Sequence, residues 1–483
     1  MGTRTLTLSI LAAALCSAAL AQPAVTITPE TGPPTDHVAA AGTGFGADEA
    51  VDIYFDTSVL ALASTTPSGG FAGIPLTIPG PAVPGTHWIT AIGRQSGLAA
   101  QASFIVQADW PQFLHGPQHQ GDNPTENVLN VSNVSEMRLL WRTSLGSFTG
   151  SSPAVAKGVV YVGSHSDLYA LNAFTGQPLW HTATGPYPTS PALANGLVYI
   201  GSVAGMFAFD ASTGRRIWSR SGDFTDAPPT VTGGVVYVGS DSEQLYALDA
   251  ASGQQLWSAA AGNAIYSSPA VANGMVYATV FDNTLNAYEA GTGRLAWIAN
   301  IDGQVSGSPT IANGMVYVGS INHSISAFNA ATGQLLWTAG PGGDTTSSPA
   351  VANGIVYIGT YSNGSLQAFS ATTGEALWIA SAPPSLDAAA SPSVANGVVY
   401  LGSVTFGFYA FNAATGQLLW SAATGGEIIS SAAVANGMVY VGSADGYLYA
   451  FGLPRAAQPP ARPDTGVRPV AITSPRNPRI PRS

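Results

Sequence analysis

The sequence predicts an all-β protein in which a closed eight-bladed β-propeller follows a small β-sandwich. Three observations predict this fold. A unit of roughly forty residues recurs between residues 109 and 452, and such a period with several strands per unit is typical of propeller blades. The 56 Gly and 34 Pro among 483 residues indicate short strands joined by tight turns. A separate run of short strands precedes the first unit.

Each repeat unit contains the pattern of four strands. Its consensus is S-P-A-V-A-N-G-x-V-Y-V-G-S, a variable stretch, and L-Y-A-L-x-A-x-T-G-x-x-L-W. Asn-Gly predicts a type I′ turn after the first strand, because this turn matches the twist of the strands. Thr-Gly predicts a second turn before the fourth strand. The glycines of the first turn are Gly158, Gly196, Gly234, Gly274, Gly314, Gly354, Gly397 and Gly437.

Eight tryptophans set the number of blades, and we expect each ring to be buried between neighbouring blades. The first Trp has no complete repeat before it, and the last repeat stops before its own Trp strand. Residues 137–142 are therefore predicted to form the outer strand of the final blade, which leaves no open sheet edge. The structural blade tryptophans are Trp141, Trp180, Trp218, Trp257, Trp297, Trp337, Trp378 and Trp420.

The N-terminus predicts a secretory signal over residues 1–21. Arg4 precedes an apolar run, and an A-x-A cleavage pattern follows at residues 19–21. Export is therefore expected, to a periplasm, to the medium or to the cell surface. The only cysteine, Cys16, lies inside the signal, so no disulfide or thiolate metal site is expected in the mature chain. No apolar run is long enough to predict a transmembrane segment.

Charge divides the rest of the chain. Residues 22–452 carry a formal net charge of −17, and residues 453–483 carry +5. An acidic body argues against nucleic acid as a partner. The sequence predicts a sandwich over 22–108, the propeller over 109–452 and a disordered Pro/Arg-rich tail over 453–483. A monomer is expected.

Residues 22–108 resemble the bacterial immunoglobulin-like domains of the IPT type. The motifs that carry this resemblance are P-x-x-G-P-P-T, G-x-G-F, A-V-D-I-Y-F and P-G-T-H-W-I-T-A, in that order. The resemblance implies a spacer or an adhesive module, and of the two the sequence favours a rigid spacer.

The repeats, with their A-x-x-x-T-G-x-x-L-W ending, resemble the pyrroloquinoline-quinone (PQQ) repeats of eight-bladed quinoprotein dehydrogenases. They resemble equally the non-catalytic relatives of these enzymes, including the propeller lipoprotein of outer-membrane barrel assembly. Residues 109–134 look like the strand that enters such propellers. For a dehydrogenase the resemblance implies a Trp floor, an adjacent-cysteine disulfide, and Ca²⁺ beside a catalytic Asp.

The chain departs from that catalytic pattern. The mature sequence has no cysteine, every repeat Trp is used by a blade, and no C-x-x-C-H haem motif occurs. No catalytic residue, metal ligand or resident cofactor is therefore predicted, and PQQ with Ca²⁺ is expected only if the protein is a dehydrogenase. His115 and His119 lie in a Gly/Pro-containing loop and are predicted to be surface residues. His323 has no evident partner.

One set of residues predicts a ligand-binding face. The loops entering each innermost strand and the hairpins after V-Y-V-G-S are expected to share one face around the central channel, with Arg220, His181 and His323 as its only basic groups. Such polar loops could bind a cation, a sugar or a peptide, or could simply be exposed. The acidic residues of this face are Asp167, Asp223, Asp226, Asp241, Glu243, Asp282, Asp302, Asp344, Asp387, Glu427 and Asp445.

The leading hypothesis is an exported, non-catalytic propeller that binds an envelope protein or glycan. Two alternatives remain: a PQQ-dependent alcohol or sugar dehydrogenase, and an outer-membrane assembly factor. The poor lipoprotein pattern before Cys16 and the extra N-terminal domain weigh against the assembly factor.

Overall fold

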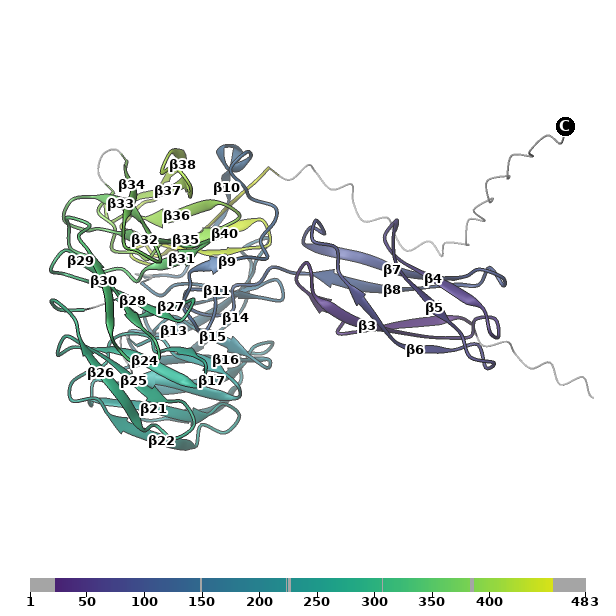
Figure 1. The fold of residues 1–483 in the computed structure, drawn as a ribbon, viewed down its shortest axis with the longest axis horizontal. Helices are drawn as coiled ribbons and strands as arrows, with labels where there is room; N and C mark the ends of the chain where they lie inside the picture. The colour runs from purple at the N-terminus through teal and green to yellow at the C-terminus, as the bar shows by residue number, and fades with distance from the viewer. Residues whose placement is uncertain are drawn as a thin grey trace, which may run out of the picture.

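The computed structural model describes residues 22–147, 150–222, 224, 227–305, 307–382 and 386–454. The predicted signal (1–21) lies outside these residues, and so does the predicted tail from residue 455 onward. The described chain is almost entirely β-structure, with one short 3₁₀ helix, η1 (Val134–Glu136). It forms a two-sheet sandwich followed by eight radially arranged sheets (Figure 1).

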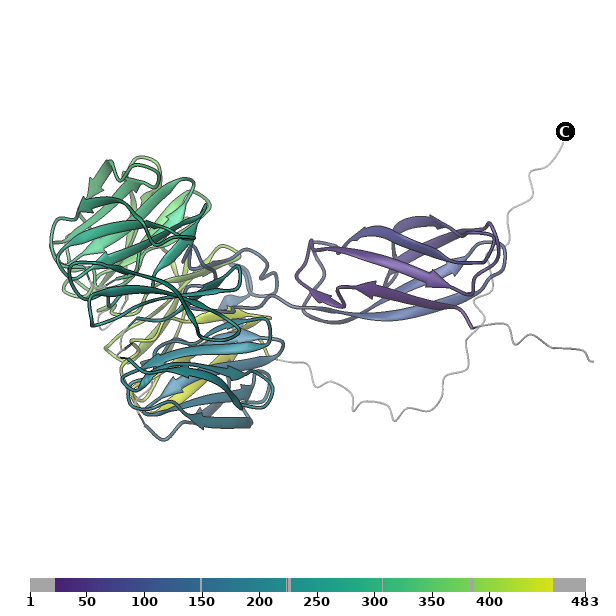
Figure 2. The ribbon, with the colours of Figure 1, turned by 90° about the horizontal axis from the view of Figure 1, so that it is seen from below.

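The N-terminal sandwich consists of two facing sheets (Figure 2). Its inward residues alternate along the strands, as in Val51, Ile53 and Phe55, which are all buried. The three-stranded sheet contains β1 (Ala24–Thr28), β3 (His37–Thr43) and β6 (Phe71–Thr77). The five-stranded sheet contains β2 (Thr31–Gly32), β8 (Ala99–Val106), β7 (Gly85–Gly93), β4 (Ala50–Phe55) and β5 (Ser58–Ser64). Its assignment to the immunoglobulin-like type remains a prediction.

Each propeller blade consists of four antiparallel strands, and in the seventh blade a short parallel strand of the preceding segment is added to the sheet. The innermost strands are β11 (Ala154–Ala156), β15 (Ala192–Ala194), β19 (Thr230–Thr232), β23 (Ala270–Ala272), β27 (Thr310–Ala312), β31 (Ala350–Ala352), β35 (Ser393–Ala395) and β39 (Ala433–Ala435). The second strands are β12 (Val159–Ser164), β16 (Leu197–Ser202), β20 (Val235–Gly239), β24 (Met275–Val280), β28 (Met315–Ser320), β32 (Ile355–Gly359), β36 (Val398–Gly402) and β40 (Met438–Gly442).

The two outer positions of each blade complete the sheet. The third strands are β13 (Asp167–Asn172), β17 (Gly205–Asp210), β21 (Gln244–Asp249), β25 (Thr284–Glu289), β29 (Ser324–Asn329), β33 (Ser365–Ser370), β37 (Gly407–Asn412) and β41 (Tyr447–Gly452). The outermost strands are β14 (Pro178–Ala183), β18 (Arg216–Arg220), β22 (Gln255–Ala260), β26 (Leu295–Asn300), β30 (Leu335–Ala339), β34 (Ala376–Ser381), β38 (Leu418–Ala423) and β10 (Arg138–Ser144).

The last blade joins both ends of the repeat region. Strand β10 pairs antiparallel with β41, with Trp141 opposite Ala450. Figure 1 shows β10 beside the strands of the C-terminal blade. The predicted closure is confirmed, and the ring has no open edge at this joint.

The tryptophans connect neighbouring blades. Each indole N–H donates to a backbone carbonyl of the next blade, at 2.8–3.2 Å. At seven joints the same carbonyl also accepts the hydroxyl of a buried tyrosine, as Ala371 accepts both Trp337 and Tyr317. The joint between blades seven and eight differs, because Trp420 alone donates to the Met137 carbonyl. There the Tyr400 hydroxyl is buried without a hydrogen-bond partner among the described residues.

The segment between the sandwich and the first blade crosses the centre of the propeller. Residues 110–123, which we call the hub segment, meet the middle residue of all eight innermost strands in turn. Seven of these residues donate their backbone N–H to the hub segment at 2.6–3.0 Å, and in the eighth blade the Val434 carbonyl accepts the Asn123 amide at 2.8 Å. The inner sheet edges therefore find hydrogen-bond partners, six in the backbone and two in the side chains of Gln112 and Asn123, that the blades cannot supply.

The hub segment forms one short strand, β9 (Asp122–Asn123), parallel to β35. It leaves the propeller on the face that carries the Asn-Gly turns, since Glu126 accepts the Gly437 N–H and Asn396 donates to the Leu129 carbonyl. Asn127 of the same stretch donates to the Gly80 and Ala82 carbonyls of the sandwich. The sandwich therefore contacts the Asn-Gly face of the propeller.

Candidate functional site

A cavity of about 380 Å³ opens in the centre of the propeller on the face opposite the Asn-Gly turns. We call it the cup. The loops entering the innermost strands and the hairpins between second and third strands form its wall, represented by Ser152, Ser190 and His165. Phe113 of the hub segment also lines it. The hub segment thus occupies the channel beneath the cup.

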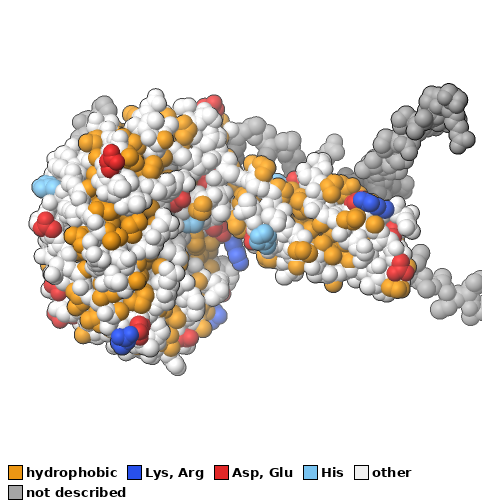
Figure 3. Space-filling view, viewed as in Figure 1, with side chains coloured by type: hydrophobic (Ala, Val, Ile, Leu, Met, Phe, Trp, Pro, Cys, Tyr) orange, Lys and Arg blue, Asp and Glu red, His pale blue; other side chains and the backbone are white. Residues whose placement is uncertain are grey.

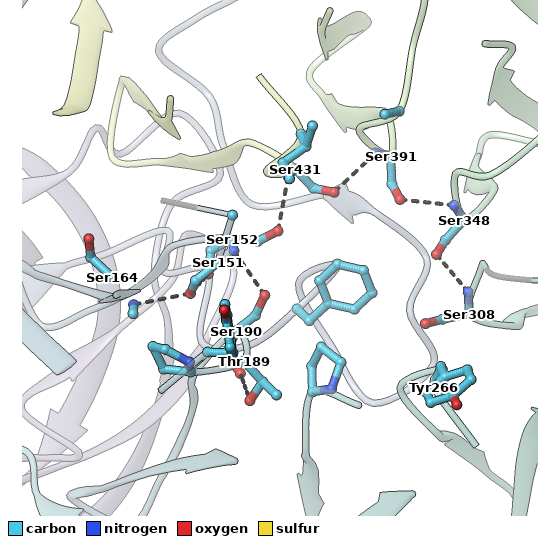
Figure 4. Close-up of a pocket in the computed structure, with 18 of the residues that line it drawn as sticks. Ser151, Ser152, Ser164, Thr189, Ser190, Tyr266, Ser308, Ser348, Ser391 and Ser431 are labelled. Atoms are coloured by element: carbon cyan, nitrogen blue, oxygen red, sulfur yellow. Dashed lines mark hydrogen bonds between the residues drawn. The ribbon is translucent and has the colours of Figure 1, made fainter. Parts of the chain in front are cut away.

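Serine side chains link the blades around this cavity (Figure 4). In each link the backbone N–H of one serine donates to the Oγ of the equivalent serine in the next blade, at 2.8–3.1 Å. We call this set the serine chain. Its members in order are Ser268, Ser308, Ser348, Ser391, Ser431, Ser152 and Ser190. All except Ser268 line the cup.

The serine chain is interrupted at the third blade, where Pro228 stands at the serine position. Proline has neither a hydroxyl nor a backbone N–H, so it can neither accept from one neighbour nor donate to the other. Ser268 instead donates to the Pro228 carbonyl at 2.8 Å. The cup therefore has a hydroxyl arc on one side and a less polar sector, with Pro228 and Tyr266, on the other.

Aromatic groups at the cup are held by their neighbours. Phe113 meets the His119 ring edge-on with centroids 5.8 Å apart. Tyr266 packs edge-on against Phe281 at 5.3 Å, whereas Tyr187 is 72 % exposed. These rings offer apolar faces close to the hydroxyl arc.

Of the two hub histidines, His119 lies in the interior and His115 is half-buried, so the prediction that both are surface residues was wrong for His119. His119 is fully buried, with its Nε2 2.9 Å from Thr230 Oγ1 and 3.3 Å from Ser268 Oγ. Burial lowers the pKa of His119 to about 3 and that of His115 to about 4. Both rings are therefore neutral at physiological pH. Burial also raises the pKa of Asp122 in the same segment to about 6.

The described acidic residues of the predicted face do not line the cup. The two predicted groups of loops do share one face: His323 of one hairpin lies 3.3 Å from Asp344 of the next entering loop, and Asn322 donates to Asp302. Asp445 accepts the Gly425 N–H and the Tyr449 hydroxyl.

Several of these carboxylates are therefore tied to their own loops. None lines the cup among the described residues: Asp167, Asp241, Glu243, Asp282, Asp302, Asp344, Asp387, Glu427 and Asp445. Asp223 and Asp226 lie outside the described part of the chain.

Two expectations about histidines need correction. His323 has Asp344 as a partner, because consecutive blades bring a hairpin beside the next entering loop. His165 was missed as a basic group of this face and lines the cup itself. Within the described ranges, no group of three or more His, Cys, Asp or Glu side chains could hold a metal ion.

The serine chain was also missed in the sequence. Its signal was the S-P pair at the start of most repeats, which was treated only as part of the repeat consensus. Few Lys and Arg side chains lie on the part of the propeller surface that Figure 3 shows. In the described chain, no helix is long and apolar enough to cross a membrane.

Comparisons with solved structures give the same architecture. BamB from Moraxella catarrhalis is 20 % identical with a TM-score of 0.57, covering 66 % of this chain and 100 % of that one. A europium-containing methanol dehydrogenase is 16 % identical with a TM-score of 0.62, and the match covers 72 % of this chain and 98 % of that one. A quinohemoprotein alcohol dehydrogenase from Comamonas testosteroni is also 16 % identical, with a TM-score of 0.60, and the match covers 73 % of this chain and 82 % of that one. At these identities the likeness shows the fold alone.

The sequence comparisons identify the family. Curated protein sequences give no match. The PQQ_2 family model, described as outer membrane protein assembly factor BamB, matches residues 130–223, 204–364, 282–403 and 362–453. These overlapping matches cover more than half of the chain and all eight blades, so the protein belongs to this family of PQQ-like propeller repeats.

Proposed function

We propose that this protein is a non-catalytic binding scaffold of the cell envelope. The observation that carries the proposal is the chemistry of the cup, the concave site on the propeller axis. Among its described lining residues the polar groups are mainly serine and threonine hydroxyls, and His165 is the one basic side chain. Hydroxyls arranged in this way can bind and orient a ligand, and the described lining contains no general acid–base pair.

The cup does not fit PQQ with its metal ion. PQQ carries three carboxylates, and burying several negative charges requires cationic partners. Calcium takes about 6–8 oxygen ligands, among them carboxylates, whereas the described lining of the cup contains no Asp or Glu. Phe113 stands beneath the cavity where the quinoprotein resemblance implies a tryptophan.

The arrangement of the two parts supports a scaffold. The sandwich contacts the Asn-Gly face through Asn127, and the cup opens on the opposite face. A spacer attached to the Asn-Gly face would hold the cup, and the acidic loops on the same face as the cup, away from the point of attachment. We propose that an envelope partner, a protein or a glycan, binds at this outward face.

A second candidate is outer-membrane protein assembly, which the description of the matching family favours. The relevant measurement is the amount of folded outer-membrane barrel proteins after the gene is deleted. A specific loss of these proteins, restored by the wild-type chain, would favour the assembly role over a general scaffold.

The dehydrogenase alternative is tested directly. Purified protein is incubated with PQQ, Ca²⁺ and a redox dye, and alcohols and sugars are added as electron donors. We expect no substrate-dependent bleaching, because the described lining of the cup offers no carboxylate to the ion and only His165 as a basic group to the carboxylates of the quinone. Bleaching that requires both PQQ and substrate would overturn the proposal of a non-catalytic scaffold.

A further inference from the structure

We propose that the cup binds an uncharged saccharide of one or two rings. This inference rests on the proposed binding scaffold and names the chemical class of a ligand for it. Its starting point is the hydrogen-bonding capacity that the serine chain leaves unused.

Each cup serine already serves one structural bond and retains capacity for others. Ser308, Ser348 and Ser391 each accept a backbone N–H from the preceding blade through Oγ. A hydroxyl has one donor hydrogen and two acceptor lone pairs, so each can still donate once and accept once. Six such hydroxyls line the cup. They are fixed by the blade joints and need little reordering to bind a ligand.

A neutral polyol matches this pattern better than an ion. Sugar hydroxyls also donate and accept at the same atom, so they can use both capacities of each serine. Among the described lining residues, a bound cation would find no carboxylate, and a bound anion would find His165 as its one basic neighbour. Burial of a charge without such partners is costly.

The less polar sector completes the match. Phe113, Pro228 and Tyr266 line the cavity together with the serines. A sugar ring has C–H groups on its faces and hydroxyls at its edge, so it can pack on these apolar groups while its edge meets the hydroxyl arc. The volume of about 380 Å³ is near the lower end of the range for ligand pockets, about 300–1,000 Å³. A short saccharide fits this size, whereas a long polymer could insert only its end.

The test uses the full chain and isothermal titration with maltose, cellobiose and N,N′-diacetylchitobiose. We expect at least one of these to bind, and we expect Ca²⁺ and PQQ not to bind in the cup. The blocking variant is Ser348→Thr/Ser391→Thr, which keeps both hydroxyls for the serine chain but adds two methyl groups to the cavity. Ser258→Thr, on the exposed face of β22, is the matched control.

The expected result is at least a tenfold loss of saccharide affinity in the double variant, with the control unchanged. Phe113→Leu provides an independent variant, because it keeps an apolar side chain in the hub segment but removes the flat ring, and it should also weaken binding. Circular dichroism and unchanged thermal unfolding establish that each variant is folded. No binding of any of the three sugars, or equal affinity in wild type and double variant, would refute the inference.

The same proteins separate this inference from the scaffold proposal. Affinity capture from an envelope extract is repeated with wild type and the double variant. A specific partner captured equally by both, without sugar binding, retains the scaffold and rejects the saccharide site. PQQ binding that the double variant abolishes would reject both, because it would place the quinone in the cup.

Discussion

Replacing Gly121 by alanine tests whether the hub segment fills the centre of the propeller. Gly121 has a φ of +63°, a region that disfavours residues with a Cβ. An added Cβ would lie 2.9 Å from the Ala350 Cβ and 3.1 Å from the Pro392 carbonyl oxygen. The backbone conformation costs about 1–2 kcal/mol, and forcing a methyl group into a packed interior costs about 1–3 kcal/mol more. We expect Gly121→Ala to lower the free energy of unfolding by about 2–5 kcal/mol.

Gly274→Ala is the matched control. Gly274 has a φ of +75°, but an added Cβ there meets no atom within 4 Å. Its expected cost is the backbone term alone, about 1–2 kcal/mol. The assay is urea unfolding followed by tryptophan fluorescence, which reports mainly on the propeller because only Trp88 lies in the sandwich. Equal costs for the two variants would mean that the hub segment is not packed against blades six and seven.

Three further predictions concern the interior. Trp420→Phe should lower the free energy of unfolding by about 1–3 kcal/mol, because the Met137 carbonyl loses its donor. Trp297→Phe should lower it less, because Tyr277 still donates to the Ala330 carbonyl that Trp297 also contacts. Equal losses in urea unfolding would contradict this. Tyr400→Phe should be neutral or stabilising, whereas Tyr317→Phe should lose about 1 kcal/mol with its bond to Ala371; a comparable loss in both would show that Tyr400 has a partner. The pKa of His119 in the folded protein, about 3, is below the ordinary 6.5. The neutral ring therefore stabilises the fold fully above pH 6.5, and this stabilisation is lost as the pH falls toward 3. His119→Gln should make the free energy of unfolding less dependent on acid pH, and an unchanged pH profile would refute this.

Local sequence patterns predicted the blades because each pattern acts within one repeat. The glycine of the first turn, the alternating strand residues and the Trp position are repeated eight times, and Asn precedes that glycine in six of the eight turns. The shared last blade could also be predicted, since the strand missing at one end was present near Trp141. These features rest on short-range chemistry and on counting.

The hub and the cup could not be predicted in the same way. Residues 110–123 have no periodic pattern, because their partners come from eight different blades. His119 lies in a loop with Gly and Pro nearby, which is typical of an exposed turn, yet burial results from the blades that surround it. Ser348 was visible as the serine that begins a repeat, but the hydrogen bond that its Oγ accepts from the Ser308 N–H depends on the distance between blades. These contacts between different blades form only when the ring is closed.

The hub segment also has a consequence for folding kinetics. Its contacts join residues far apart in the chain: the bond from Asn123 to Val434 spans 311 positions. Long-range contacts slow folding, because chain entropy is lost before the contact forms. The hub precedes every blade in the sequence, so its last partner is synthesised only with the eighth repeat. We therefore expect the final closure of the ring around this central segment to be slow.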